Sequence, residues 1–178
     1  MPKISIAMLV PVVAIGVILM FTFGLGRDDP NALPSTLEGR LAPALVTTVL
    51  GDLPLIQDKD LRADGVKLVN YWASWCQPCR AEHPNLMALK DMGIPIYGVN
   101  YKDESPKGLK FLSDLGNPYT AVGQDAAGRQ AIDWGVYGVP ETFVIDGKGK
   151  ILLRFPGPIT SRVLQETILS LIAKANGS

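Results

Sequence analysis

Short apolar runs alternate with longer amphipathic runs along most of this chain, and their periods predict its secondary structure. Runs of β-prone residues predict strands at residues 68–73, 94–100, 142–146 and 150–154. Helix formers and apolar residues at helical spacing predict helices at residues 77–90, 105–115, 128–134 and 160–174. This order predicts an α/β fold with a central mixed sheet flanked by helices, to which residues 42–66 add an N-terminal β segment.

The N-terminal stretch differs from the rest because residues 4–25 hold no charged side chain. A helix of that length spans roughly 33 Å at about 1.5 Å per residue, enough to cross the hydrocarbon core of a bilayer. We therefore expect a transmembrane anchor at residues 4–25, a linker rich in proline and glycine at 26–41 and one globular domain at 42–178. The alternative is a cleaved signal peptide, whose apolar core is usually only about 7–15 residues long.

Basic residues on either side of the apolar stretch set its expected orientation. Lys3 precedes the stretch, whereas Arg27 follows it beside two aspartates. This slight bias places the N-terminus inside and the domain outside. The expected location is a bacterial inner membrane, crossed once, with the domain in the oxidising periplasm.

The charge balance argues against a nucleic-acid partner. The chain holds 17 basic and 17 acidic side chains, and no basic stripe runs along it. Internal repeats and low-complexity tracts are also missing from the sequence.

Candidate chemistry is concentrated in the only two cysteines, Cys76 and Cys79, which lie between an expected strand and an expected helix. Cys76 is therefore placed near a helix N-terminus, where free N–H groups and the helix dipole favour a thiolate. A thiolate attacks a disulfide and a thiol does not. The C-x-x-C pair thus predicts a redox-active disulfide, and no other cofactor is expected.

Other roles for the pair are less well matched by the sequence. A structural disulfide would close a very short loop and stabilise little. His83 follows Cys79 by one turn, but zinc normally takes four ligands and the chain has no second Cys or His pair, so no metal site is expected. A copper-carrying role stays open. Covalent haem attachment needs C-x-x-C-H, and Arg80 occupies the last position.

Two separated motifs resemble thioredoxin. The first is Trp75-Cys-Gln-Pro-Cys79, followed after five residues by Pro84. The second is the run from Gly138 to Phe143, in which Pro140 opens an expected strand. Thioredoxin-like proteins carry a cis-proline in a loop that faces the dithiol, and the resemblance implies this role for Pro140.

Three further runs narrow the resemblance to one branch. Residues 98–103, 115–119 and 135–146 are similar to the thiol–disulfide oxidoreductases of cytochrome c maturation, the CcmG/DsbE family. The run Gly-Val-x-Gly-x-Pro-Glu-Thr-Phe is its specific element, and the resemblance covers most of residues 36–175.

The resemblance implies roles for the residues around the dithiol. Cys76, expected to be the exposed cysteine, attacks a partner disulfide, and Cys79 resolves the mixed disulfide. Trp75 and Pro78 line the contact surface. The backbone of Val139, beside Pro140, is free to pair with an extended partner segment.

Two carboxylates are predicted near the dithiol. Glu82 follows Cys79 by three residues and is placed to accept its proton, unless it is a solvated surface residue. Glu141 follows Pro140 and is expected to make the site acidic and to favour partners with basic residues. Tyr71 and Trp72 are expected to be packing residues, and His83 is expected to be a packed or a surface residue without a catalytic role.

The direction of electron flow is not written in a C-x-x-C pair. The resemblance implies reduction of a disulfide in the haem-attachment C-x-x-C-H of apocytochrome c or in an assembly protein, with a membrane electron donor that re-reduces the dithiol. Two alternatives stay open: a related reductase for assembly of the cytochrome oxidase copper site, and a non-enzymatic dithiol chaperone for a metal or the haem pathway.

Overall fold

A computed structural model describes residue 11, residues 13–20 and residues 37–176, and divides the chain into a unit at Met1–Pro34 and a unit at Ser35–Ser178. In the first unit, residue 11 and residues 13–20 are helical. Within the described residues, no helix combines the length and the apolar character needed to cross a membrane. The remainder of the expected anchor and linker, up to residue 36, lies outside the described residues.

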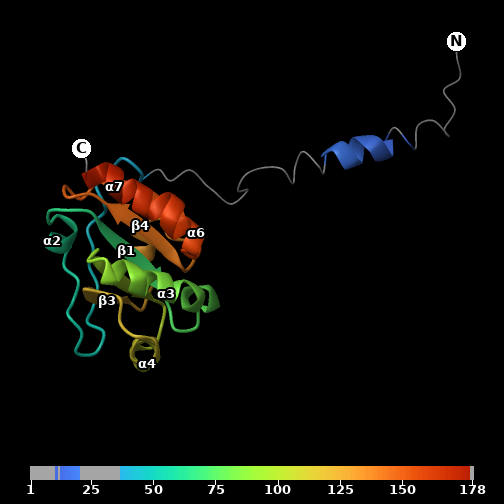
Figure 1. Ribbon diagram of the computed structural model, residues 1–178. Coiled ribbons are helices and arrows are strands. Elements are labelled where there is room, and N and C mark those ends of the chain that lie inside the picture. The colour runs from blue at the N-terminus through green and yellow to red at the C-terminus, as the bar shows by residue number, and fades with distance from the viewer. Residues whose placement is uncertain (1–10, 12, 21–36, 177–178) are drawn as a thin grey trace, which may run out of the picture. The chain divides into compact units, whose positions relative to one another are not determined.

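The second unit is built on a five-stranded sheet with the order β3-β2-β1-β4-β5 (Figure 1). The central strand, β1, is parallel to β2 and antiparallel to β4; β3 is parallel to β2, and β5 is antiparallel to β4. The predicted mixed sheet is therefore confirmed. Its strands are β1 (Lys67–Trp72), β2 (Ile96–Tyr101), β3 (Ala121–Asp125), β4 (Glu141–Ile145) and β5 (Ile151–Pro156).

Helices cover both faces of this sheet, as expected, and each face has its own apolar cluster. One cluster joins the sheet to α3 (Gln77–Asp91), α4 (Ser105–Leu115) and the C-terminal helical segment. The other joins it to α2 (Asp58–Leu61) and α5 (Arg129–Asp133). The C-terminal segment consists of α6 (Ser161–Val163), the π-helical η1 (Leu164–Leu169) and α7 (Ser170–Asn176), where one α-helix was predicted.

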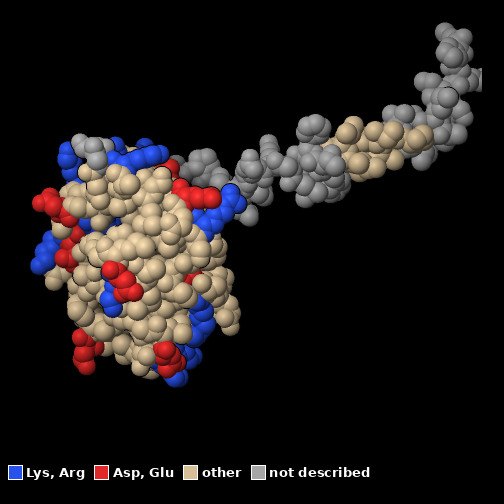
Figure 2. Space-filling view, in the orientation of Figure 1, with Lys and Arg blue, Asp and Glu red and all other residues tan. Residues whose placement is uncertain are grey.

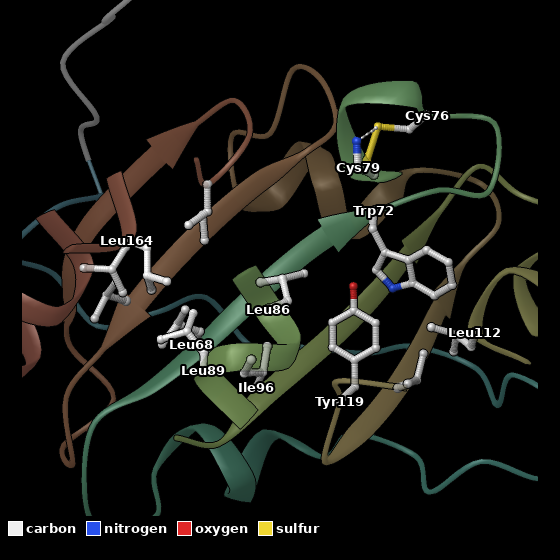
Figure 3. Packing of buried hydrophobic residues seen from close by; sticks show 14 of the residues in the cluster. Leu68, Trp72, Cys76, Cys79, Leu86, Leu89, Ile96, Leu112, Tyr119 and Leu164 are labelled. Carbon is white, nitrogen blue, oxygen red and sulfur yellow. Dashed lines mark hydrogen bonds between the residues drawn. A yellow bond between two sulfur atoms is a disulfide. The ribbon is translucent and has the colours of Figure 1, made fainter. Parts of the chain in front are cut away.

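The cluster between the sheet and α3 forms the platform below the cysteine pair (Figure 3). The Trp72 ring stacks on Tyr119 with centroids 5.6 Å apart, and the centroid of the Phe111 ring lies 5.1 Å from that of Trp72. Cys76 and Cys79 belong to this cluster and lie at its end, next to Trp72. The predicted packing role of Trp72 is confirmed.

The N-terminal part of the domain differs from the sequence-based expectation. Residues 42–66 form α2 and irregular segments, with a bridge from Thr48 to Gln124 in place of the predicted β segment. The segment crosses β3 so closely that a Cβ atom on Gly123 would lie 2.0 Å from the Thr47 hydroxyl oxygen. Strand β3 itself was missed because it is short and contains Gly123 and a polar Gln124, so it shows no apolar alternation.

Residues 37–41 were placed in the linker by the sequence but belong to the domain. Leu41 forms a bridge with Lys150, and the Gly39 amide donates to the Ile151 carbonyl at 2.9 Å. The folded domain therefore begins earlier than residue 42.

Charged side chains are interspersed over the face of the domain seen in Figure 2, without a large area of one sign. Exposed ion pairs occur along the helices of the domain, among them Lys110 with Asp114 on α4 and Arg162 with Glu166 on the C-terminal helical segment. Such exposed pairs contribute little stability.

Candidate functional site

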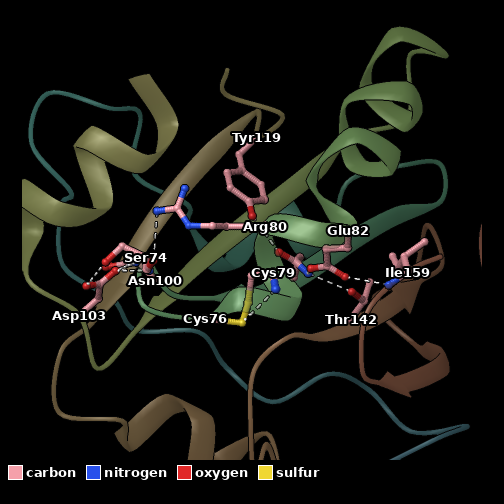
Figure 4. Close-up of a disulfide and its surroundings, with 11 residues drawn as sticks. Ser74, Cys76, Cys79, Arg80, Glu82, Asn100, Asp103, Tyr119, Thr142 and Ile159 are labelled. Atoms are coloured by element: carbon pink, nitrogen blue, oxygen red, sulfur yellow. Dashed lines mark hydrogen bonds between the residues drawn. A yellow bond between two sulfur atoms is a disulfide. The ribbon is translucent and has the colours of Figure 1, made fainter. Parts of the chain in front are cut away.

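The cysteine pair lies where β1 ends and α3 begins, as the sequence predicts. Cys76 and Cys79 form a disulfide, and Cys76 is the N-cap of the 15-residue α3 (Figure 4). The backbone amide of Cys79 donates to the Cys76 sulfur at 3.1 Å. Pro78 stands in the first turn of α3, where a missing N–H leaves no helical hydrogen bond unmade. Donor groups and the helix dipole are thus directed at Cys76.

Exposure at the pair differs from the expectation. Cys76 is 3% exposed and Cys79 is 2% exposed, so in the disulfide form Cys76 is not the exposed cysteine. Both cysteines pack in the apolar cluster between the sheet and α3, and their sulfur atoms are bonded to each other. The exposed rim consists instead of the flanking residues, with Trp75 58% exposed and Pro78 also exposed. This agrees with a contact role for both residues.

The Val139–Pro140 peptide bond is cis, as the resemblance implies. Strand register explains its position. Glu141 pairs with Tyr71 in the antiparallel β1–β4 ladder, so Pro140 lies at the end of the sheet where β1 leads into Cys76. Pro140 is buried and Val139 is half-buried. The loop is therefore placed beside the dithiol.

Glu82 is an interior residue of the site. Its side chain is 1% exposed, which excludes the solvated surface alternative. One carboxylate oxygen accepts from the Asn70 side-chain amide at 2.9 Å and the other from the backbone amide of Ile159 at 2.9 Å. Burial raises the pKa of Glu82 to about 7, and these two hydrogen bonds oppose the rise. A group with this pKa exchanges protons readily near neutral pH.

The side chain of Glu82 belongs to a buried polar network that the sequence-based prediction missed. Asn70 donates to Glu82 and also to the Thr142 hydroxyl at 3.0 Å, and its oxygen accepts from the Tyr119 hydroxyl at 2.8 Å. Asn70 is a polar residue in the middle of a strand that is buried throughout, and this is the signal that could have revealed it.

Glu141 lies on the opposite face of the sheet. Its side chain is 1% exposed and forms an ion pair with Arg154. Burial raises the pKa of Glu141, and the Arg154 guanidinium opposes the rise. The prediction that Glu141 makes the surface acidic and contacts the partner is therefore corrected. The alternating direction of side chains in β4 turns Glu141 away from the α3 face, toward which Thr142 points.

The Glu141–Arg154 pair braces the loop before Pro140. Arg154 also donates to the Gly135 carbonyl at 2.6 Å, and its guanidinium lies 4.8 Å from the centre of the Tyr137 ring. Tyr137 is exposed, so the buried Glu141–Arg154 pair is linked to the surface through this residue.

A second brace holds the loop before Cys76. Asp103 accepts from the backbone amide of Ser74 at 2.6 Å and from its hydroxyl at 2.8 Å. The Trp75 indole donates to the Lys102 carbonyl at 3.1 Å. Neither Asp103 nor Ser74 was singled out from the sequence, because the two residues are far apart along the chain.

His83 and Tyr71 are packing residues, as expected. Both are buried, and the His83 ring lies edge-on to Phe111 with one ring nitrogen 3.0 Å from the Gly116 carbonyl oxygen. In the part of the chain that the structure describes, no group of three or more His, Cys, Asp or Glu residues is arranged to hold a metal ion.

Comparison with known proteins agrees with this geometry. A family model described as Redoxin matches residues 37–168. The thiol:disulfide interchange protein HelX of Rhodobacter capsulatus is 50% identical over 151 residues, covering 85% of this chain and 86% of that protein. The DsbE homologue of Paracoccus denitrificans is 47% identical over 180 residues, covering 98% of this chain and all of that protein.

A solved structure shows the same fold. The crystal structure of a candidate thiol:disulfide interchange protein DsbE from Chlorobium tepidum superposes with a TM-score of 0.64 at 28% identity, covering 79% of this chain and 99% of that one.

Proposed function

We propose that this chain reduces disulfides in apocytochrome c or in a cytochrome c assembly protein. It belongs to the Redoxin family and is a thiol–disulfide oxidoreductase of the DsbE type. The observation that carries the proposal is the Cys76–Cys79 pair at the start of α3, placed beside cis-Pro140. The run from Gly135 to Asp146, which contains that proline, supports the choice of partner through its resemblance to cytochrome c maturation proteins.

The reaction begins with the reduced enzyme. The Cys76 thiolate, stabilised by the N-terminus of α3, attacks one sulfur of the partner disulfide. The partner S–S bond breaks, a new S–S bond joins Cys76 to the partner, and the other partner sulfur leaves as a thiolate that takes a proton. The number of disulfide bonds is unchanged at this stage, because one S–S bond has replaced another.

Resolution of the mixed disulfide uses Cys79 and Glu82. The carboxylate of Glu82, one turn along α3 from Cys79, accepts the proton of the Cys79 thiol. The Cys79 thiolate attacks the Cys76 sulfur, the bond to the partner breaks, and the partner leaves with both sulfurs reduced. Two electrons have moved, and the enzyme holds the Cys76–Cys79 disulfide until a membrane dithiol donor reduces it.

The partner binds through backbone and apolar contacts. An extended segment of the partner pairs with the backbone of Val139, in the manner of strand addition. Trp75 and Pro78 flank the sulfur pair on the exposed rim. These contacts hold the partner disulfide in line with Cys76 and depend little on the side chains of the partner segment.

A peptide assay tests the proposed substrate. The reduced domain is expected to reduce a disulfide-bonded C-x-x-C-H peptide in a one-to-one ratio, and at least about tenfold faster than a small neutral disulfide, because strand pairing supplies binding energy that the small compound lacks. Reaction is followed by loss of free thiol on the domain. A disulfide-bonded peptide from the cytochrome oxidase copper site is the matched competitor, and faster reduction of that peptide would reassign the partner.

We also propose that residues 4–25 anchor the domain in the bacterial inner membrane on its periplasmic side, because they form an uncharged stretch of sufficient length. The full chain is expected to stay with the membrane pellet after a high-salt and alkaline wash, and its N-terminal residues are expected to remain attached. The matched control is the same chain without residues 1–26, which is expected to be washed off. A mature chain that begins near residue 27 and washes off would contradict the anchor.

A further inference from the structure

The buried network around Asn70 connects residues that are far apart along the chain. Glu82 from α3, Thr142 from β4 and Tyr119 from the loop before β3 meet between the sheet and α3 (Figure 4). Asn70 from β1 is hydrogen-bonded to all three. All four are buried. The amide of Asn70 is the centre of this network, because every hydrogen bond that joins the four side chains to one another involves it.

We propose that Asn70, oriented by the Tyr119 hydroxyl, is a positioning residue that directs a hydrogen-bond donor at the carboxylate of Glu82 and thereby favours its ionised, proton-accepting form. The inference rests on the proposed function, in which Glu82 accepts the proton of Cys79. It assigns roles to Asn70 and Tyr119, neither of which touches the reacting sulfur atoms in the proposed reaction.

The orientation of the Asn70 amide follows from what lies at each end of it. The Tyr119 hydroxyl is 2.8 Å from the amide oxygen and serves as its donor, while the amide nitrogen faces the Glu82 and Thr142 oxygens. If the amide were turned over, its oxygen would face a carboxylate oxygen in a buried site. The Tyr119 hydroxyl stabilises the orientation in which Glu82 receives a donor.

Tyr119 is held independently of Glu82. Its ring stacks on Trp72 at an interplanar angle of 22°, with centroids 5.6 Å apart. Gly98 on β2 lies against the same ring, and an added Cβ atom there would be 2.8 Å from Tyr119 and 3.0 Å from the Trp72 indole nitrogen. The hydroxyl is therefore fixed by packing, as a positioning group requires.

Hydrogen bonds, rather than nearby charges, offset the burial of Glu82. Its ionisation is shifted by burial and by the Asn70 and Ile159 donors alone. The titratable group that shares its hydrogen-bond network is Tyr119, because Cys79 is held in the disulfide. Other charged groups of the packed elements face elsewhere: Lys67 and Glu141 lie on the opposite face of the sheet, and Arg80 and His83 pack on Phe111.

The variant Tyr119→Phe tests the inference because it removes one oxygen and keeps the stacked ring. The midpoint of Glu82 ionisation, followed by carbon NMR of its carboxyl group in the disulfide form, is expected to rise by about half a pH unit. Asn70→Ala, which removes the donor itself, is expected to raise it by about one unit. The rate of mixed-disulfide resolution at pH 7 is expected to fall about twofold and about fivefold, respectively, in step with the ionised fraction of Glu82, with recovery at higher pH.

The matched control is Tyr71→Phe. The Tyr71 hydroxyl is also buried, but it faces the other side of the sheet and has no hydrogen-bond partner among the described residues. This variant is expected to leave unchanged both the midpoint of Glu82 ionisation and the rate of mixed-disulfide resolution. If the midpoint of Glu82 ionisation in Tyr119→Phe equals that in Tyr71→Phe, the inference is overturned. This comparison does not depend on whether Asn70→Ala folds. By contrast, if the rate of mixed-disulfide resolution depends on pH in Glu82→Gln as it does in the wild type, the proposed role of Glu82 itself is overturned.

Discussion

Replacing Cys76 with serine is expected to abolish reduction of the partner disulfide, lowering the rate by more than about a thousandfold. A serine hydroxyl does not ionise near neutral pH, so no sulfur nucleophile remains at the N-terminus of α3. Replacing Cys79 with serine leaves the first attack intact and stops the reaction at the mixed disulfide. The rate is measured as release of partner thiols by the purified reduced domain.

Loss of activity in Cys76→Ser is not expected to come from unfolding. The disulfide closes a loop of only a few residues, so removing it raises the chain entropy of the unfolded state very little. The thermal midpoint of the variant is expected to stay close to that of the reduced wild-type domain, which is the matched control. Retained exchange in Cys76→Ser would show that Cys79 is the attacking thiol and would reverse the assigned roles.

Glu82→Gln is expected to slow resolution of the mixed disulfide by about a hundredfold at pH 8 while leaving the first attack by Cys76 nearly unchanged. Glutamine keeps the shape of the side chain but cannot take a proton from Cys79. The rise of the wild-type rate with pH around 7, where the buried carboxyl ionises, is expected to disappear in the variant. Stopped-flow measurement of the two steps separates them.

The same residue makes stability depend on pH in a definite direction. Because burial raises the pKa of Glu82 from 4.5 to about 7, the folded chain holds a proton in this range that the unfolded chain has released. Stability is therefore expected to fall as pH rises through this window, by about 3 kcal/mol in total. The wild-type minus Glu82→Gln difference in unfolding free energy isolates this effect.

An exposed glutamate provides the control for that measurement. Glu166 forms only an exposed pair with Arg162, so Glu166→Gln is expected to change the pH dependence little. Parallel stability curves for wild type and Glu82→Gln between pH 4.5 and 7 would contradict the raised pKa of Glu82.

Local patterns in the sequence were sufficient for the parts of the site that are close together along the chain. Helix 77–90 was predicted within one residue of α3, because this run is rich in helix formers. The position of the cysteines at a strand-to-helix junction followed from the same run. Pro140 was identified through the resemblance, since an isolated proline before a strand gives no signal of a cis bond.

Contacts made across the fold were not accessible from the sequence. The Tyr119–Asn70 hydrogen bond joins residues 49 positions apart, and it depends on the packing of Tyr119 against Trp72 and Gly98 in the folded domain. Glu141 was misjudged for a related reason. Adjacent residues in a strand point to opposite faces, and the sequence did not show which of Glu141 and Thr142 faces α3.

Covalent trapping in native membranes tests the central claim most directly. The full chain carrying Cys79→Ser is expressed in place of the wild type, free thiols are blocked, and disulfide-linked species are separated and identified by mass spectrometry. The account predicts a mixed disulfide between Cys76 and a cysteine of an apocytochrome c C-x-x-C-H site or of a cytochrome c assembly protein, absent when Cys76 is also replaced by serine. Failure to form any species linked through Cys76, or the same species in the double variant, would contradict it.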